Sequence, residues 1–133
     1  MRKTVMPVLL MLLTAILLAG CSKASKNNPE SAAVQPVEAF YNAIVTQDRD
    51  KVSSIACADW EKNALRDVDS FMGVKSELKD FSCSAAEMGT DEATVTCKGV
   101  IAASYGAEIT EFPLEGRTHK VIKEQGEWRF CGY

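Results

Sequence analysis

The sequence predicts an α+β domain in which three N-terminal helices pack on a curved antiparallel sheet. Apolar residues recur at helical spacing from about residue 36 to 72, and from about residue 78 they alternate with polar or small residues. Helical segments followed by a run of strands are typical of helices gathered on one face of an antiparallel sheet. The part of the chain after Gly20 has the length of one small domain, so a single core is expected.

The first helix is expected to begin near Pro36. Proline is favoured in the first turn of a helix, where its missing N–H costs nothing. Val37, Phe40 and Ile44 then recur at helical spacing, and the pattern runs through Thr46. These residues predict an apolar face that packs on the sheet.

Two shorter helices follow a polar break over residues 47–50. Asp48 or Asp50 can cap the second helix through a side-chain oxygen, and Asp59 can cap the third. Because glycine tolerates the left-handed conformation found just past a helix end, the third helix is expected to end near Gly73. Its apolar face comprises Trp60, Ala64, Val68 and Phe71.

The sheet is expected to open with a hairpin. A three-residue loop over 89–91 pairs Met88 with Glu92, and this register sets Cys83 opposite Cys97. Residues paired in this way lie on the same face of the sheet. The same register pairs Ala85 with Val95 and Phe81 with Gly99.

Further turns divide the rest of the chain into strands. A turn over 105–107 leads into strand-like sequence from Ile109 to Lys123, in which Pro113 predicts an edge position, an irregularity or a break. Residues 124–127 predict a last hairpin turn before a final strand over 128–133. The pattern leaves the register of this hairpin open.

Four cysteines, Cys57, Cys83, Cys97 and Cys131, follow Cys21. An even number in a small exported domain indicates disulfides rather than free thiols. The hairpin register favours Cys83–Cys97, because directly opposed residues lie within disulfide distance, and this leaves Cys57–Cys131. The spacings match neither a zinc ribbon nor a Cys-x-x-Cys redox pair, so no metal site is expected.

The N-terminal residues have the layout of a secretory signal peptide. Arg2 and Lys3 precede an apolar run from Thr4 to Leu18, which is too short for a permanent membrane span of about 20 residues. Leu18-Ala19-Gly20-Cys21 resembles the lipobox of bacterial lipoproteins, in which the cysteine becomes the acylated first residue. The resemblance implies a signal peptide over 1–20, lipidated Cys21 with a flexible tether over 21–35, and a domain over 36–133.

The charge of the chain excludes some classes of partner, and the residue after Cys21 bears on its location. Arg2 and Lys3 leave with the signal peptide while all 18 acidic residues remain, so the mature chain is acidic, and it holds no basic cluster. Nucleic-acid binding is therefore not expected, and membrane attachment should depend on acyl chains. Ser22 follows the cysteine in place of the aspartate that marks inner-membrane retention in enterobacteria. This leaves an outer-membrane location open for an organism that has one.

The order of elements resembles the cone-shaped fold of the nuclear-transport-factor-2-like superfamily. The likeness is carried by the opening helix Val37–Ile44, the acidic turn with Asp48 and Asp50, and the closing segment 124–130 with its Gly-x-Trp-Arg-aromatic hairpin. The chain looks most like the small bacterial lipoproteins of that superfamily, including those named as lumazine-binding. The superfamily usually binds small ligands at the mouth of the cone and contains enzymes as well as binding modules.

Tyr41 is the strongest catalytic candidate. Ketosteroid isomerases of this superfamily use a tyrosine of the first helix as an oxyanion donor, with a strand aspartate as base, and Tyr41 has a broadly similar place. No carboxylate of the predicted strands pairs with it clearly. His119, the only histidine, is expected at the surface or half-buried on a strand, without a catalytic role.

Large aromatic side chains are candidates either for the core or for the lining of a cone pocket. Each alternates correctly for burial, and a domain of this size needs its aromatic residues for stability alone. The candidate pocket residues are Tyr41, Trp60, Tyr105, Trp128 and Phe130.

These observations favour a non-catalytic, membrane-anchored domain that binds a small molecule or an envelope partner outside the cytoplasm, without a cofactor. The sequence shows no nucleophile motif and no glycine-rich phosphate loop. The alternatives are a small isomerase or dehydratase that uses the cone pocket, and a purely structural or immunity-type protein. A homodimer is left open.

The lipobox gives a direct prediction. Cys21→Ala removes the acylated residue, so the protein should move from the membrane fraction to the soluble extracytoplasmic fraction on cell fractionation. Membrane attachment that persists in this variant would mean that the anchor lies elsewhere.

Overall fold

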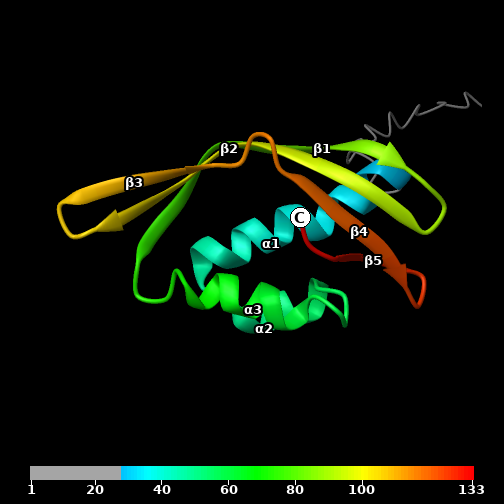
Figure 1. Ribbon diagram of the computed structural model, residues 1–133, viewed down its shortest axis with the longest axis horizontal. Coiled ribbons are helices and arrows are strands. Elements are labelled where there is room, and N and C mark those ends of the chain that lie inside the picture. Colours follow the sequence, from blue (N-terminus) through cyan, green and yellow to red (C-terminus); the bar gives the residue numbers. More distant parts are fainter. Residues whose placement is uncertain (1–27) are drawn as a thin grey trace, which may run out of the picture.

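The computed structural model describes residues 28–133, so the predicted signal peptide and the predicted lipidation site Cys21 lie outside the described residues. Three helices precede five strands, and all three helices lie against the concave side of the curved sheet (Figure 1). The helices are α1 (Pro29–Thr46), α2 (Arg49–Ile55) and α3 (Glu61–Asp69). The strands are β1 (Lys75–Met88), β2 (Glu92–Tyr105), β3 (Glu108–Pro113), β4 (Thr118–Glu124) and β5 (Glu127–Phe130). This architecture confirms the predicted α+β cone. No helix of the described residues is long and apolar enough to cross a membrane.

Helix α1 begins at Pro29, so the prediction of a start at Pro36 and of a flexible tether up to residue 35 was wrong. Asn28 caps the helix by accepting a hydrogen bond from the N–H of Glu30 at 3.1 Å, and Pro29 occupies the first turn. Pro36 therefore lies inside the helix, where proline costs about 3 kcal/mol. Burial of the preceding apolar residues Ala33 and Val34 in the core offsets this cost.

The short helices follow the predicted caps only in part. The side chain of Asp48 accepts from the N–H of Lys51 at 2.9 Å, as predicted for α2. The prediction that Asp59 caps α3 was wrong, because the cap position is Trp60 and no side chain caps this end. The N–H groups of Trp60 and Glu61 instead donate to the carbonyl of Cys57.

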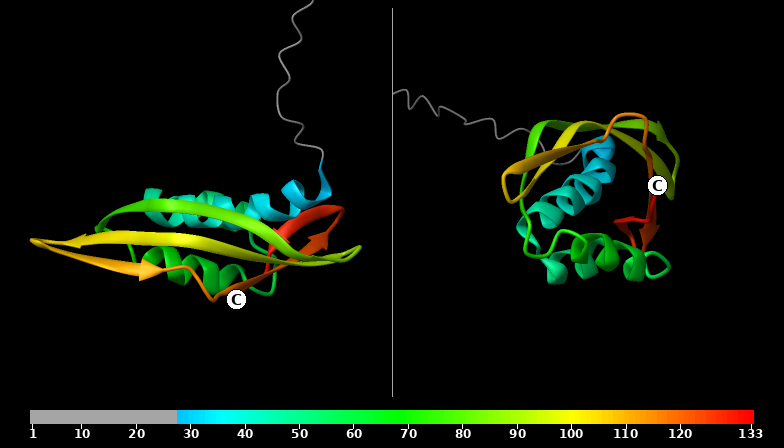
Figure 2. Two further views of the ribbon diagram at one scale, coloured as in Figure 1. Left: turned by 90° about the horizontal axis from the view of Figure 1, so that it is seen from above. Right: turned by 60° about the vertical axis from the view of Figure 1, so that its left-hand side comes forward.

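Strand β2 is the centre of the sheet. β1 pairs with it along nearly its whole length on one side. On the other side, β3 pairs with its C-terminal part and β4 with its N-terminal part, and β5 lies beyond β4. Of the edge position, irregularity or break that Pro113 predicted, the structure shows a break, because β3 ends at this residue. As a result, the β2–β3 hairpin projects from the body on one side and the β4–β5 hairpin closes the other (Figure 2).

The predicted register of the first hairpin is confirmed at its centre and shifted at its ends. Cys83 pairs with Cys97, and Ala85 pairs with Val95. Irregularities between Lys79 and Ser82 and between Ala85 and Glu87 displace the other pairs. Phe81 and Gly99 are therefore not a regular pair, and Met88 pairs with Ala93 instead of Glu92. β-Bulges bend and twist a strand, so these shifts accompany the curvature of the sheet.

Gly99 lies where β2 changes neighbours. Its φ is +104°, and a Cβ added there would lie 2.6 Å from the carbonyl oxygen of Lys79 and 2.7 Å from that of Asp80. The Gly99 N–H donates to Oε1 of Glu115 at 3.0 Å, and its carbonyl accepts from the N–H of Leu114 at 3.0 Å. The hydrogen bond from the Gly99 N–H is the largest cause that lowers the pKa of the Glu115 carboxyl. Only glycine fits this close approach of three chain segments.

Both predicted disulfides are present. Cys83–Cys97 joins β1 to β2, and Cys57–Cys131 joins the loop before α3 to the end of β5. The second crosslink is reinforced by the N–H of Cys57, which donates to the carbonyl of Phe130 at 2.8 Å. Disulfides persist mainly in oxidising compartments, so this pattern indicates a location outside the cytoplasm.

The close approach at Gly99 predicts a large difference between two glycines. Gly99→Ala should lower the free energy of unfolding by about 3 kcal/mol or more, since the left-handed backbone strain adds to a clash with backbone oxygens. Gly106→Ala is the matched control: φ is +68° there, but no atom lies within 4 Å of the added Cβ. The Gly106→Ala variant should lower the free energy of unfolding by only about 1 kcal/mol. Equal losses in urea unfolding would contradict the role given to Gly99.

Candidate functional site

A cavity of about 300 Å³ lies between the C-terminal half of α1, helix α3 and the sheet. Most of its wall is apolar or aromatic, and its polar side chains include Tyr41 of α1, Asp67 of α3, Arg117 before β4 and Tyr133. Its size is at the lower end of the range for small-molecule pockets. The lining residues are Phe40, Tyr41, Ile44, Asp67, Ser70, Phe71, Ile101, Tyr105, Phe112, Leu114, Arg117 and Tyr133.

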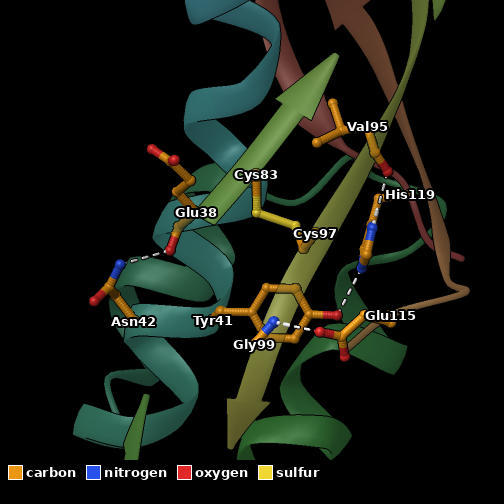
Figure 3. Close-up of a disulfide and its surroundings, with 9 residues drawn as sticks. All are labelled: Glu38, Tyr41, Asn42, Cys83, Val95, Cys97, Gly99, Glu115 and His119. Carbon is orange, nitrogen blue, oxygen red and sulfur yellow. Dashed lines mark hydrogen bonds between the residues drawn. A yellow bond between two sulfur atoms is a disulfide. The ribbon is translucent and has the colours of Figure 1, made fainter. Parts of the chain in front are cut away.

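A hydrogen-bonded chain runs from the cavity wall into the sheet. The hydroxyl of Tyr41 lies 2.6 Å from Nε2 of His119, and Nδ1 of His119 lies 3.0 Å from the carbonyl oxygen of Val95 (Figure 3). Because a carbonyl oxygen can only accept, the imidazole proton must be on Nδ1. Nε2 is then an acceptor, so the Tyr41 hydroxyl donates its proton to His119.

Burial keeps both members of this pair neutral. Burial raises the pKa of Tyr41 to about 12, with the charge and hydrogen bonding of Arg117 acting in the opposite direction. Burial also lowers the pKa of His119. The hydrogen bond to the Val95 carbonyl raises this pKa, and the positive charge of Arg117 lowers it further. At neutral pH the pair is therefore an uncharged phenol bound to an uncharged imidazole.

The prediction that His119 lies at the surface or half-buried was wrong, since no part of it is exposed. Its position on β4 faces the concave side of the sheet, where the rings of Tyr41, Phe130 and Tyr133 surround it. The flanking polar residues Thr118 and Lys120 are exposed and gave the segment its surface character. Strand alternation could have assigned His119 to the same face as the buried Val121.

Three further polar groups meet at the cavity. The hydroxyl of Tyr133 donates to Oδ2 of Asp67 at 2.6 Å, and the guanidinium of Arg117 lies 5.4 Å from the centre of the Tyr133 ring. Burial and the hydrogen bond to the Asp67 carboxylate raise the pKa of Tyr133. Arg117 forms no ion pair with any residue of the range 28–133. The cavity therefore contains one positive charge without a carboxylate partner.

The C-terminal residues are held firmly at this position. Cys131 is bonded to Cys57, its N–H donates to the carbonyl of Lys120, and the N–H of Lys120 donates to the carbonyl of Gly132. A Cβ on Gly132 would lie 3.0 Å from the Trp60 ring, so the chain passes directly over this indole. The disulfide and these contacts place Tyr133 on the cavity wall.

The five predicted pocket residues do not share one site. Tyr41 is buried and lines the cavity, and Tyr105, although 47% exposed, also lines it. Phe130 is a core residue that packs against Phe40, with ring centres 4.4 Å apart. Trp60 makes an edge-to-face contact with the ring of Tyr133 and does not line the cavity itself. Trp128 lines a separate surface groove beside α1.

Sequence reasoning missed Asp67, Arg117 and Tyr133 as members of the site. A periodic pattern marks apolar positions, so it does not single out the polar side chains of Asp67 and Arg117 or the terminal Tyr133, and the three are far apart along the chain. Among residues 28–133, no group of His, Cys, Asp and Glu side chains lies close enough to hold a metal ion.

Comparison with known proteins supports the fold and leaves the activity open. No protein-family model matches the chain, and no curated protein matches it significantly. A proposed ketosteroid isomerase from Shewanella frigidimarina is similar over 74% of this chain and 89% of its own, with 17% identity and a TM-score of 0.52. An LEH-like epoxide hydrolase from Mycobacterium tuberculosis is also similar. The match covers 78% of this chain and 80% of the hydrolase, with 18% identity and a TM-score of 0.51. A third similar structure is an uncharacterised protein with a cystatin-like fold from Caulobacter vibrioides. The match covers 79% of this chain and 87% of that protein, with 16% identity and a TM-score of 0.51. Likenesses at this level of identity show a shared cystatin-like, cone-shaped fold and carry no activity over to this chain.

The buried imidazole predicts a pH-dependent stability. In the unfolded chain His119 titrates near its ordinary pKa of 6.5, whereas in the folded protein its pKa is lower. Between the two values the unfolded state binds more protons, so the free energy of unfolding should fall as the pH decreases below about 6.5. The loss should level off once the pH is below the pKa of the folded state.

Urea unfolding at a series of pH values measures this contribution. His119→Gln is the comparison, because glutamine is polar but does not titrate. The variant should have a lower free energy of unfolding than the wild type at pH 7.5. It should not show the further decrease on acidification that protonation of His119 causes. Parallel curves for the two proteins would show that other groups cause the acid sensitivity.

Proposed function

We propose that the protein is a lipid-anchored binding domain outside the cytoplasm, which holds a small organic acid with a mostly apolar body in the cavity beside Tyr41. The observation that carries this proposal is Arg117: a guanidinium without an ion-pair partner in residues 28–133 lines a cavity whose other walls are largely apolar. The lipobox at Cys21 and the two disulfides support the anchoring and the location.

The charge distribution favours an acid over an amine. Arginine binds carboxylates through two parallel hydrogen bonds, which makes it well suited to recognise an anionic group. The one carboxylate in the lining, that of Asp67, already accepts a hydrogen bond from Tyr133. Rings such as those of Phe71 and Phe112 can cover the apolar body of the ligand.

The Tyr41–His119 pair supports binding rather than catalysis. An oxyanion donor needs its proton free for the substrate, and the proton of Tyr41 is directed to His119. A general base should titrate near the working pH, but Tyr41 titrates far above it and His119 lies behind Tyr41.

One observation favours an enzyme as the second candidate. Tyr41 and the carboxylate of Asp67 line the same cavity, and a carboxylate near a tyrosine hydroxyl is an arrangement that proton-transfer enzymes use. On that reading Asp67 would be the base of an isomerase or dehydratase.

Calorimetry with matched ligands tests the acid-binding proposal. Phenylacetate and octanoate should bind to the exported, disulfide-bonded protein, and their methyl esters should bind more weakly. Arg117→Gln should lower the affinity for both acids by about 10- to 100-fold, as expected for loss of a charge-assisted hydrogen bond of about 1.5–3 kcal/mol. Asp67→Asn is the matched control and should change their affinity by no more than about threefold.

Other outcomes would overturn the proposal. Equal affinity for acid and ester, or unchanged binding in Arg117→Gln, would remove the role of the guanidinium. Preference for amines, lost in Asp67→Asn, would mean that the cavity recognises cations. Turnover of a bound compound that Asp67→Asn abolishes would favour the enzyme.

A further inference from the structure

We propose that acid binding in this cavity is coupled to protonation of His119: the added proton reverses the Tyr41–His119 hydrogen bond and turns the Tyr41 hydroxyl into a donor toward the bound acid. This inference rests on the proposed function and assigns a proton-linked regulation to the same site. His119 then acts through Tyr41, as a positioning residue that does not itself touch the ligand.

The donor and acceptor arrangement of the pair allows only this reversal. In the neutral state the Nδ1–H donates to the Val95 carbonyl and Nε2 accepts from Tyr41. A protonated imidazole has two donors and no acceptor. The bond to Val95 is unchanged, but Nε2–H must now donate to the Tyr41 oxygen. The hydroxyl proton of Tyr41 is then released from His119 and can turn to the cavity that Tyr41 lines.

The charged and titratable groups around the pair come from three parts of the fold. Arg117, before β4, acts on both Tyr41 and His119. Asp67 of α3 acts on Tyr41, and the phenol of Tyr133 interacts with both Asp67 and Tyr41. Strand β2 contributes only the neutral carbonyl of Val95, and β5 only the ring of Phe130.

These groups fix the direction of the coupling. Without ligand, the positive charge of Arg117 opposes a second positive charge on His119. A bound carboxylate or sulfonate offsets the charge of Arg117 and accepts from the released Tyr41 hydroxyl, so the ligand favours protonation. By linkage, protonation favours the ligand to the same extent. The affinity for an acid should therefore rise as the pH falls below neutral, by at most about tenfold per pH unit.

The experiment uses a probe whose own charge is constant between pH 5 and 8. Benzenesulfonate is titrated into the exported protein by calorimetry at pH 6, in two buffers with different enthalpies of ionisation. The wild type should take up a fraction of a proton for each ligand bound, and its affinity should be at least about threefold higher at pH 5.5 than at pH 7.5. His119→Gln should bind benzenesulfonate without proton uptake and without this pH dependence.

Nuclear magnetic resonance tests the same coupling without a variant. His119 is the only histidine, so in protein purified without a histidine tag its imidazole signals are unambiguous. The free protein should show the Nδ1–H tautomer, and saturating benzenesulfonate should raise the pKa of His119.

The failures can be told apart. Binding of benzenesulfonate with no proton uptake and an unchanged His119 titration would overturn the coupling while the acid site stands. Proton uptake that persists in His119→Gln would assign it to another group and also overturn the inference. Absence of binding by benzenesulfonate and phenylacetate at every pH would overturn the proposed function, and the inference with it.

Discussion

The close approach of three chain segments at Gly99 sets the shape of the domain. Gly99 lies between the part of β2 that pairs with β4 and the part that pairs with β3, and the irregular part of β1 passes within contact distance on the other side. The carboxylate of Glu115 and the N–H of Leu114 satisfy the backbone groups that the change of neighbours would otherwise leave unpaired. A flat continuous sheet could not cover three helices on one face and leave room for a cavity between them.

The two disulfides hold opposite sides of this arrangement. Cys83–Cys97 crosslinks β1 and β2 near the bend, close to the place where the ring of Tyr41 contacts Phe81. Cys57–Cys131 crosslinks the helical layer to the end of β5. A small domain buries a limited core, so covalent links between layers stabilise it by restricting the unfolded chain. Here the second link also fixes the wall of the cavity.

The polar chain from Val95 through His119 to Tyr41 explains why a buried histidine is tolerated in this core. Each of its groups has a partner, so burial carries no penalty for unpaired donors or acceptors. The arrangement is fully satisfied only while the imidazole is neutral. The proposed acid ligand would act on this arrangement through the charge of Arg117.

Local patterns decided much of the fold. The change from helical to alternating periodicity placed the helices and strands, the Asp48 cap and the break at Pro113 set two boundaries, and the hairpin register paired Cys83 with Cys97. All of these depend on residues close together in the sequence, or on strands joined by a short turn. The start of α1 was misplaced because the favourable burial that compensates Pro36 comes from contacts outside the helix.

The candidate site depended on tertiary structure. Tyr41 and His119 are 78 positions apart, and Tyr133 and Asp67 are 66 apart. No periodic signal marks such polar residues, since a polar side chain on a strand fits solvent as well as it fits a buried partner. The sequence by itself determined the order of the helices and strands and the disulfide framework. Only the fold decided which polar groups lose water and face one another, because burial and pairing there depend on packing between distant segments.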